Sequence, residues 1–237
     1  MAIAAVFFDW VNTLVHMEPD RHTICVEVCR DHGIDVDPVK AVQGFYAADQ
    51  RVPEGRPINW SDNLPVETFI QYNNIVLSEA GVAPPDRETT LSIIAAIRQR
   101  ARDVRFVPFA DASTATKALK ERDLTIGVLS NMSRPLAPYL ERLGLAEAID
   151  FSITSAEVEG SGKPEAPIFL EALKRAGCLA SEAIHVGDEP FVDGTGASRV
   201  GISPVLLDRL GVHADVLDYP RISTLDELPA MIDSLAA

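Results

Sequence analysis

Basic residues are scarce in this sequence, and long hydrophobic runs are missing from it. Its 237 residues include 21 Lys and Arg against 35 Asp and Glu, which gives a formal net charge of −14 at pH 7. Nucleic-acid backbones are bound by clusters of Lys and Arg, which this sequence lacks, so no nucleic-acid partner is expected. No apolar run reaches the roughly 18 residues that a membrane-spanning helix needs, so no membrane partner is expected either.

Cysteine is also rare, with residues only at Cys25, Cys29 and Cys178. An odd number of cysteines without regular spacing is typical of a reducing compartment. The N-terminal segment has no basic stretch before its apolar residues, unlike a secretory signal peptide. Both features predict a cytoplasmic protein. Cys25 and Cys29 lie four residues apart on an expected helix, where an apolar stripe explains them better than a metal site does.

Short continuous apolar runs recur along the chain, as in strands that are buried on both faces of a parallel sheet. They occupy residues Ile3–Phe8, Leu124–Leu129, Ile184–Val186 and Pro204–Leu207. Amphipathic segments lie between most of these runs. One helix is expected between an N-cap at Ser133 and a stop at Gly144, and another ends at Gly177. Strands that alternate with helices predict an α/β fold with a Rossmann-like, doubly wound parallel sheet.

Residues 16–102 follow a different pattern, because helical stripes occur there without convincing strands. Helices are expected at Cys25–His32, Val66–Leu77 and Thr89–Arg100, and a loop rich in Pro, Gly and Asn is expected at Arg51–Pro65. A helical block inserted directly after a first strand is typical of a cap domain on an α/β core. We therefore predict a catalytic core of residues 1–15 and 103–237, and a helical cap of residues 16–102.

Four short segments carry the candidate chemistry, and three of them end strands. They are FFDWVNTL around Asp9, GVLSNMS around Ser130, GSGKPEAPIF around Lys163 and HVGDEPFVDG around Asp188. Ligands of open α/β sheets bind beyond the carboxyl ends of the strands, so we expect these segments to meet at one edge. Phosphoryl transfer needs such groups: a carboxylate nucleophile, a hydroxyl donor, an ammonium group, and further carboxylates for Mg²⁺.

In this order, the four segments resemble motifs I to IV of the haloacid dehalogenase superfamily of hydrolases. The helical insert resembles the cap of subgroup I of that superfamily. The stretches VLSNMSRPLAPYLERLGL and FSITSAEVEGSGKPEAPIFLEAL are most similar to the subfamily that includes haloacid dehalogenase-like hydrolase domain-containing protein 3. The resemblance covers nearly the whole chain. It implies a hydrolase, in particular a Mg²⁺-dependent phosphatase of a small phosphorylated metabolite.

The resemblance also implies roles for individual residues. The catalytic residues that it implies are Asp9 as the nucleophile, Ser130 and Lys163. The metal ligands that it implies are Asp9, the backbone carbonyl of Val11, Asp188 and Asp193, with Glu189 as an alternative ligand. The substrate-binding residues are Asn131 and Thr13. Asn12 stands where the family usually has Gly, and Asn tolerates unusual backbone angles better than most residues.

One position departs from the family's phosphatases, which carry a second Asp two residues after the nucleophile. That Asp protonates the leaving group and then activates water, whereas Val11 can do neither. General acid–base catalysis contributes ~10²–10⁴-fold, so a phosphatase needs a substitute or an acidic leaving group. The nearest candidates in sequence are His16, Glu18 and Asp20, although roles as linker residues are favoured for them.

Three alternative functions stay open. Dehalogenases of the superfamily keep one Asp in motif I but lack the Gly-Asp pair found in HVGDEPFVD, which argues against that activity. Phosphonoacetaldehyde hydrolases use a cap lysine, and the sole lysine of the expected cap, Lys40, is better explained as a surface residue. A non-catalytic binding protein would not need the charges of Asp9, Lys163 and Asp188. Candidate substrate contacts in the cap loop, for which surface roles are favoured, are Arg51, Arg56 and Trp60.

Overall fold

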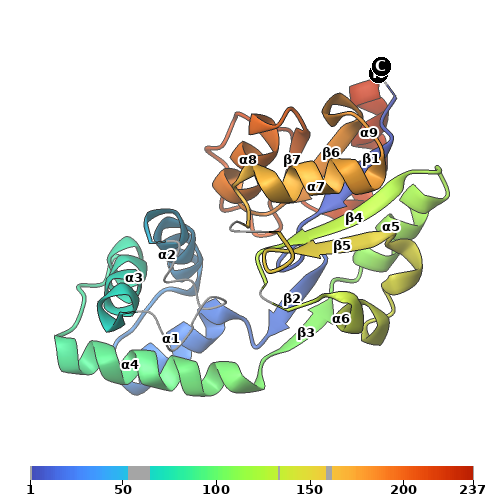
Figure 1. Ribbon diagram of the computed structural model, residues 1–237. Helices are drawn as coiled ribbons and strands as arrows, with labels where there is room; N and C mark the ends of the chain where they lie inside the picture. Colours follow the sequence, from blue (N-terminus) through green and yellow to red (C-terminus); the bar gives the residue numbers. More distant parts are fainter. Residues whose placement is uncertain (1, 53–64, 133, 159–161, 237) are drawn as a thin grey trace. The chain divides into compact units, whose positions relative to one another are not determined.

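The computed structural model describes residues 2–52, 65–132, 134–158 and 162–236. The chain divides into two compact units (Figure 1), which we call the α/β unit, Met1–His16 and Val107–Ala237, and the helical unit, Met17–Phe106. It passes from one unit to the other twice, in β2 (Val15–Glu18) and in β3 (Arg105–Pro108). These two strands pair with each other in a two-stranded sheet.

The α/β unit is built on a six-stranded parallel sheet with the order β5-β4-β1-β6-β7-β8. Its strands are β1 (Ala5–Phe8), β4 (Thr125–Ser130), β5 (Phe151–Thr154), β6 (Ala183–Gly187), β7 (Ser203–Leu207) and β8 (Arg221–Ile222). The strand order reverses at β1, which lies between β4 and β6. Open α/β sheets bind ligands at such a switch point. The predicted α/β fold with a parallel, Rossmann-like sheet is confirmed.

The core of this unit explains why its strands are continuous apolar runs. All four residues of β1 are completely buried, as expected for a central strand covered on both faces. On one face, α7 (Ala166–Ala176) places Ile168 and Phe169 against Phe7 and Leu129, and Figure 1 shows α7 lying across the sheet. The other helices of this unit are α5 (Ala112–Lys120), α6 (Ala137–Arg142), α8 (Gly196–Arg199) and α9 (Leu228–Ala236).

The helical unit contains α1 (Arg21–Asp31), α2 (Pro38–Arg51), α3 (Val66–Glu79) and α4 (Arg87–Arg100). Three of these helices begin with an Asp N-cap whose side chain accepts a backbone N–H: Asp20, Asp37 and Asp86. The four helices share one apolar core. Helix α2 approaches α3 closely at Gly44, where a Cβ atom would lie 2.4 Å from the carbonyl oxygen of Val76.

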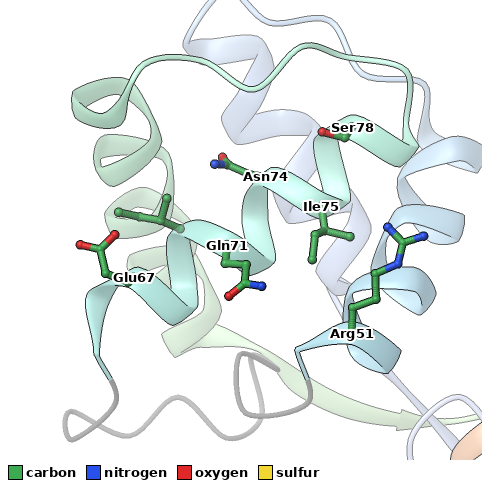
Figure 2. Close-up of a pocket in the computed structure, with 7 residues that line it drawn as sticks. Arg51, Glu67, Gln71, Asn74, Ile75 and Ser78 are labelled. Atoms are coloured by element: carbon green, nitrogen blue, oxygen red, sulfur yellow. The ribbon is translucent and has the colours of Figure 1, made fainter.

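A hollow of about 580 Å³ lies within the helical unit (Figure 2), lined mainly by α3. Arg51, a candidate substrate contact, lines this hollow and pairs with Glu79 at 2.7 Å. Arg56 and Trp60, the other two candidates, lie outside the described residues. Because Arg51 ends α2 rather than lying in a loop, the expected loop began one residue too early.

Several predicted elements differ from the observed ones. Helix α2 was missed, because half of its six buried residues are Ala or Gly and one is Asp, although Asp37 followed by Pro38 is a typical helix start. Helix α6 has Leu136 at its N-cap position, and the expected cap Ser133 lies outside the described residues. Strand β2 extends to Glu18, so residues after His16 do contain strand structure.

Among the described residues, no helix combines the length and the apolar character that crossing a membrane would require.

Candidate active site

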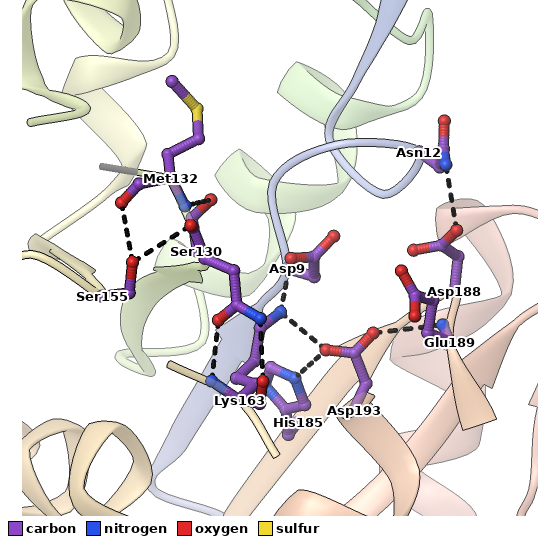
Figure 3. Close-up of polar contacts among 11 residues, drawn as sticks. Asp9, Asn12, Ser130, Met132, Ser155, Lys163, His185, Asp188, Glu189 and Asp193 are labelled. Atoms are coloured by element: carbon purple, nitrogen blue, oxygen red, sulfur yellow. Dashed lines mark hydrogen bonds and ion pairs between the residues drawn. The ribbon is translucent and has the colours of Figure 1, made fainter. Parts of the chain in front are cut away.

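Three carboxylates gather at the carboxyl ends of β1 and β6 (Figure 3). Asp9 directly follows β1, Asp188 directly follows β6, and Asp193 lies in a π-helix at Pro190–Thr195. One carboxylate oxygen from each of the three lies within 4.8 Å of the other two. The sheet therefore brings together, at its switch point, side chains that are up to 184 positions apart in the sequence (Asp9 and Asp193).

Lys163 supplies positive charge to this cluster. Its ammonium group pairs with Asp9 Oδ1 and, at 2.7 Å, with Asp193 Oδ1, while its side chain is 1% exposed. Burial alone would lower the pKa of Lys163, but the attraction of Asp193 and Asp9 outweighs it and raises that pKa. The ammonium group therefore stays charged and offsets part of the negative charge of the carboxylates.

Asp193 is held by three donors. Its Oδ1 accepts hydrogen bonds from Lys163 Nζ and, at 2.9 Å, from His185 Nε2, and its Oδ2 accepts one from the Glu189 backbone N–H at 3.1 Å. Burial opposes ionisation of this carboxyl, yet Lys163 and His185 lower its pKa. An ionised carboxylate can accept about four hydrogen bonds or metal contacts, so these three donors take up most of the capacity of Asp193 and fix its orientation.

Gly187 allows this arrangement at the end of β6. A Cβ atom at Gly187 would lie 2.2 Å from Asp193 Cγ, so a larger residue would displace the carboxylate. The π-helix that follows carries Asp193 back toward the strand, with the Asp193 N–H donating to the Glu189 carbonyl at 2.8 Å. Such π-turns are frequent at functional sites. Close packing against Asp193 thus explains the glycine of the pair Gly187-Asp188, in addition to the resemblance of this pair to a motif.

The loop after β1 turns sharply around Asp9. The backbone N–H of Asn12 donates to the Val15 carbonyl at 2.6 Å, and Val11 forms an isolated bridge with Val15. Asp9 is 8% exposed, and burial raises its pKa while Lys163 opposes that change. The side-chain amide of Asn12 donates to Asp188 Oδ2 at 3.1 Å, which joins the two loops.

The residues expected to bind substrate have defined structural contacts. Asn131 exchanges two hydrogen bonds with the backbone of Lys163: its Nδ2 donates to the carbonyl at 2.8 Å, and its Oδ1 accepts the N–H at 2.7 Å. Ser130, at the end of β4, is 3% exposed and accepts a hydrogen bond from the Met132 N–H at 3.2 Å. Thr13 is fully buried, and its carbonyl accepts a hydrogen bond from Arg209 at 2.9 Å.

The candidate acids near motif I have structural partners. Glu18 pairs with Arg105 at 2.8 Å, and Asp20 caps α1 by accepting the Thr23 N–H at 2.7 Å. His16 packs against the ring of Phe109, with 5.0 Å between ring centroids. These contacts agree with the linker roles that the sequence favoured for these residues.

Two residues of the site were missed in the sequence. His185 lies on β6, is completely buried and bonds Asp193. Its place in HVGDE, three residues before Asp188, was a signal that could have found it. Arg209 follows β7 and pairs with Asp111 at 2.8 Å while stacking on Phe109, with its guanidinium carbon 3.8 Å from the ring centroid. No sequence motif marked Arg209.

The donor set of the cluster fits a hard divalent cation. Carboxylate oxygens are the protein ligands that Mg²⁺ prefers, together with backbone carbonyls and water. Asp9, Asp188 and Asp193 present these oxygens within the short span given above. The described part of the cluster contains no thiolate, and its imidazole, His185, faces Asp193. An acidic cluster of this composition can hold a metal ion.

The fold and the four motifs define a haloacid dehalogenase-type hydrolase. A family model of haloacid dehalogenase-like hydrolases matches residues 3–201, and the chain belongs to this family. Mouse haloacid dehalogenase-like hydrolase domain-containing protein 3 is 30% identical, over 84% of this chain and 80% of its own. The predicted superfamily and the similarity to this subfamily are confirmed.

Two further relatives carry names that specify a reaction. A ribulose-1,5-bisphosphate 5-phosphatase from Halopiger xanaduensis is 29% identical, over 98% of this chain and 95% of its own. The crystal structure of a 2-haloacid dehalogenase from Pseudomonas syringae superposes with a TM-score of 0.57 and 25% identity, over 99% of this chain and 100% of the other. Phosphate and carbon–halogen chemistry thus both occur among proteins similar to this one.

Proposed function

We propose that the protein is a Mg²⁺-dependent phosphatase that uses Asp9 as its nucleophile. The observation that carries the proposal is the cluster of Asp9, Asp188 and Asp193 around buried Lys163 at the switch point of the sheet. Acidic residues gathered at a ligand-binding edge suit a cation, and a phosphate needs a cation beside an anionic nucleophile. The similarity to a bisphosphate phosphatase over nearly the full chain supports the same chemistry.

The reaction proceeds in two displacements. The Asp9 carboxylate attacks phosphorus, the bond between phosphorus and the leaving oxygen breaks, and the phosphoryl group is left on Asp9. Water then attacks that phosphorus, releases inorganic phosphate and restores the carboxylate. Lys163, held by Asp9 and Asp193, neutralises charge during both steps. Ser130, Asn131 and Thr13 form the substrate side of the site in this proposal, with Asn131 acting through Lys163.

The metal site consists of Asp9, Asp188 and the Val11 carbonyl, with Asp193 as support. Bound there, Mg²⁺ supplies the positive charge that lets a carboxylate approach a phosphate. Glu189, the alternative ligand, donates its backbone N–H to Asp193 at 3.1 Å.

The two units have separate roles in this proposal. The α/β unit is the catalytic core, and the helical unit is the cap that controls access and substrate choice, because the core site is generic to the family. The substrate class is a small phosphorylated metabolite. We place the enzyme in the cytoplasm, where its three free cysteines stay reduced.

A 2-haloacid dehalogenase is the second candidate. The similarity to the Pseudomonas syringae dehalogenase favours it, and so does the single carboxylate of the motif I loop, where Val11 follows Asp9. The pair Gly187-Asp188 argues against a dehalogenase, because displacement of a halide by a carboxylate requires no cation site.

Hydrolysis of an activated aryl phosphate tests the proposal, because its acidic leaving group needs little protonation. We expect hydrolysis with Mg²⁺, and its loss both with EDTA and in Asp9→Asn. Activity that survives in Asp9→Asn would refute the nucleophile. Chloride release from a 2-chloroacid without phosphatase activity would establish the second candidate instead.

A further inference from the structure

Asn12 adopts a backbone conformation that most residues avoid. Its φ is +63°, in the left-handed region. A residue with a Cβ pays about 1–2 kcal/mol there, less for Asn, whereas Gly pays none. Among the described residues, Asp123 is the other non-glycine with positive φ, at +58°. Since Gly would suit the backbone at position 12 better, the Asn side chain needs an explanation of its own.

The Asn12 side chain has a specific partner far away in the sequence. Its amide nitrogen donates to Asp188 Oδ2 at 3.1 Å, across 176 positions of the chain. Asp188 itself is 5% exposed. The left-handed turn and the bond from the Asn12 N–H to the Val15 carbonyl fix the direction in which the amide points. Figure 3 shows this amide aimed at the Asp188 carboxylate.

The chemistry of the amide suits its position. Three carboxylates already share the cluster with the single charge of Lys163. A neutral N–H donor can restrain a carboxylate without adding another charge, whereas a cation would compete with a metal ion and an anion would repel its neighbours. The amide takes up a single acceptor position of Asp188, and an ionised carboxylate can accept about four hydrogen bonds or metal contacts.

We propose that Asn12 is a positioning residue that orients the Asp188 carboxylate for divalent cation binding. The proposal rests on the cation site of the proposed function. Partners that hydrogen-bond to a metal ligand fix its orientation, and their removal typically weakens metal affinity by about 10–100-fold. The strained backbone at position 12 is thus retained for the sake of its side chain.

Asn12→Gly separates this role from a purely structural one. Gly keeps the left-handed turn and relieves its strain, so the variant should fold at least as stably as the wild type. The same exchange at Asp123 is a matched control, because Asp123 has nearly the same φ and lies in the turn between α5 and β4. Both variants gain the same backbone relief, and only Asn12→Gly loses the amide.

Calorimetric titration of the full-length protein with MgCl₂, without substrate, measures the affinity directly. We expect Asn12→Gly to bind Mg²⁺ about 10–100-fold more weakly than the wild type, and Asp123→Gly to match the wild type. Thermal unfolding in EDTA should show neither variant less stable than the wild type. The Mg²⁺ concentration for half-maximal aryl phosphate hydrolysis should rise in Asn12→Gly.

Two results would overturn the proposal, and only the second would also contradict the proposed function. If Asn12→Gly and the wild type bound Mg²⁺ with equal affinity, Asn12 would have no role in cation binding, but the proposed phosphatase function would be unaffected. A wild-type protein that binds no Mg²⁺ at millimolar concentration would also remove the cation site of the proposed function.

Discussion

Val11 separates this chain from the phosphatases that its motifs resemble. It occupies the position two residues after Asp9, and an isopropyl group can neither give nor take a proton. In the described α/β unit, the charged groups nearest to Asp9 are already engaged: Lys163 pairs with two carboxylates, and Asp193 accepts three hydrogen bonds. Protonation of the leaving group is therefore the step for which this unit is least equipped.

Val11→Asp should restore that step. An alkyl phosphate, whose leaving group needs a proton, should be hydrolysed about 10²-fold faster or more by the variant, because general acid–base catalysis contributes on that order. An aryl phosphate should gain far less. Steady-state kinetics on both substrates measure the difference, and Val11→Asn is the control of similar shape without an acid. Equal gains on the two substrates, or a gain in Val11→Asn, would contradict this interpretation of Val11.

Lys163 should be as important for stability as for catalysis. Lys163→Met removes the charge and keeps the buried aliphatic stem, which leaves Asp9 and Asp193 facing each other without compensation. Breaking a buried ion pair in this way typically costs about 3–5 kcal/mol. Urea unfolding in EDTA should show a loss of that order, with hydrolysis abolished. A loss below about 1 kcal/mol would mean that the two carboxylates take up protons or move apart.

At the scale of elements, the end of β6 and the π-helix after it together fix the position of Asp193. Gly187→Ala would place a methyl group 2.2 Å from Asp193 Cγ and push the carboxylate away from Lys163. Overpacking of this kind costs about 1–3 kcal/mol. Gly44→Ala in α2 is a useful comparison, because its methyl group would lie 2.4 Å from the Val76 carbonyl oxygen in the helical unit.

Both alanine variants should unfold at lower temperature, but they should differ in metal binding. Gly187→Ala should lose most of its Mg²⁺ affinity in a calorimetric titration, whereas Gly44→Ala should keep it, since α2 belongs to the other unit. Unchanged Mg²⁺ affinity in Gly187→Ala would show that the position of Asp193 is unimportant for the cation site.

A second set of contacts, made by Arg209 and Asp111, links the segment after β7 to the start of α5 and to the motif I loop. Arg209 donates to both Asp111 oxygens, at 2.8 and 2.9 Å, and to the Thr13 carbonyl, while Asp111 also accepts the Leu225 N–H. Burial favours the protonated form of Asp111, but the hydrogen bonds from Arg209 and Leu225 outweigh it and lower its pKa. The ion pair therefore stabilises the fold wherever Asp111 is ionised.

This pair predicts a pH dependence of stability. A carboxyl whose pKa is lowered by folding contributes stability above its unfolded pKa of about 3.9, and that contribution is lost as the pH falls through the folded pKa. At pH 7, Asp111→Asn should lower the free energy of unfolding by about 1.5–3 kcal/mol, as expected for a hydrogen bond to a charged group. Denaturant unfolding between pH 7 and pH 3 measures the difference in the free energy of unfolding between Asp111→Asn and the wild type. This difference should become smaller below pH ~4. A constant difference would contradict the assignment.

The elements also show how far the sequence can be interpreted. Continuous apolar runs predicted β1, β4, β6 and β7, because a central parallel strand must be apolar on both faces. Strand β5 (FSIT) was missed, since four residues with polar positions give too weak a pattern. Asp9 and Asp188 were predicted from strand ends and motif order together, and Lys163 from motif order. His185 was missed although its place in HVGDE was a signal, whereas Arg209 acts through tertiary contacts, which no local pattern encodes.

At the scale of the whole molecule, the proposed function assigns chemistry to the α/β unit and recognition to the helical unit. The α/β unit contains every residue of the carboxylate cluster and Lys163, while the helical unit has its own apolar core. The net charge of −14 would disfavour anionic substrates over most of the surface, so attraction must come from local positive groups such as Lys163 and a bound cation.

In the proposed function, Asp9 becomes covalently phosphorylated during each turnover. The most direct measurement is to mix the protein with Mg²⁺ and excess aryl phosphate, quench with acid within the first turnover, and analyse the peptides by mass spectrometry. We expect the mass of one phosphoryl group on the peptide that contains Asp9, with none in Asp9→Asn or with EDTA. Hydrolysis that proceeds equally well in Asp9→Asn, or a phosphoryl group trapped on another residue, would contradict the proposed role of Asp9.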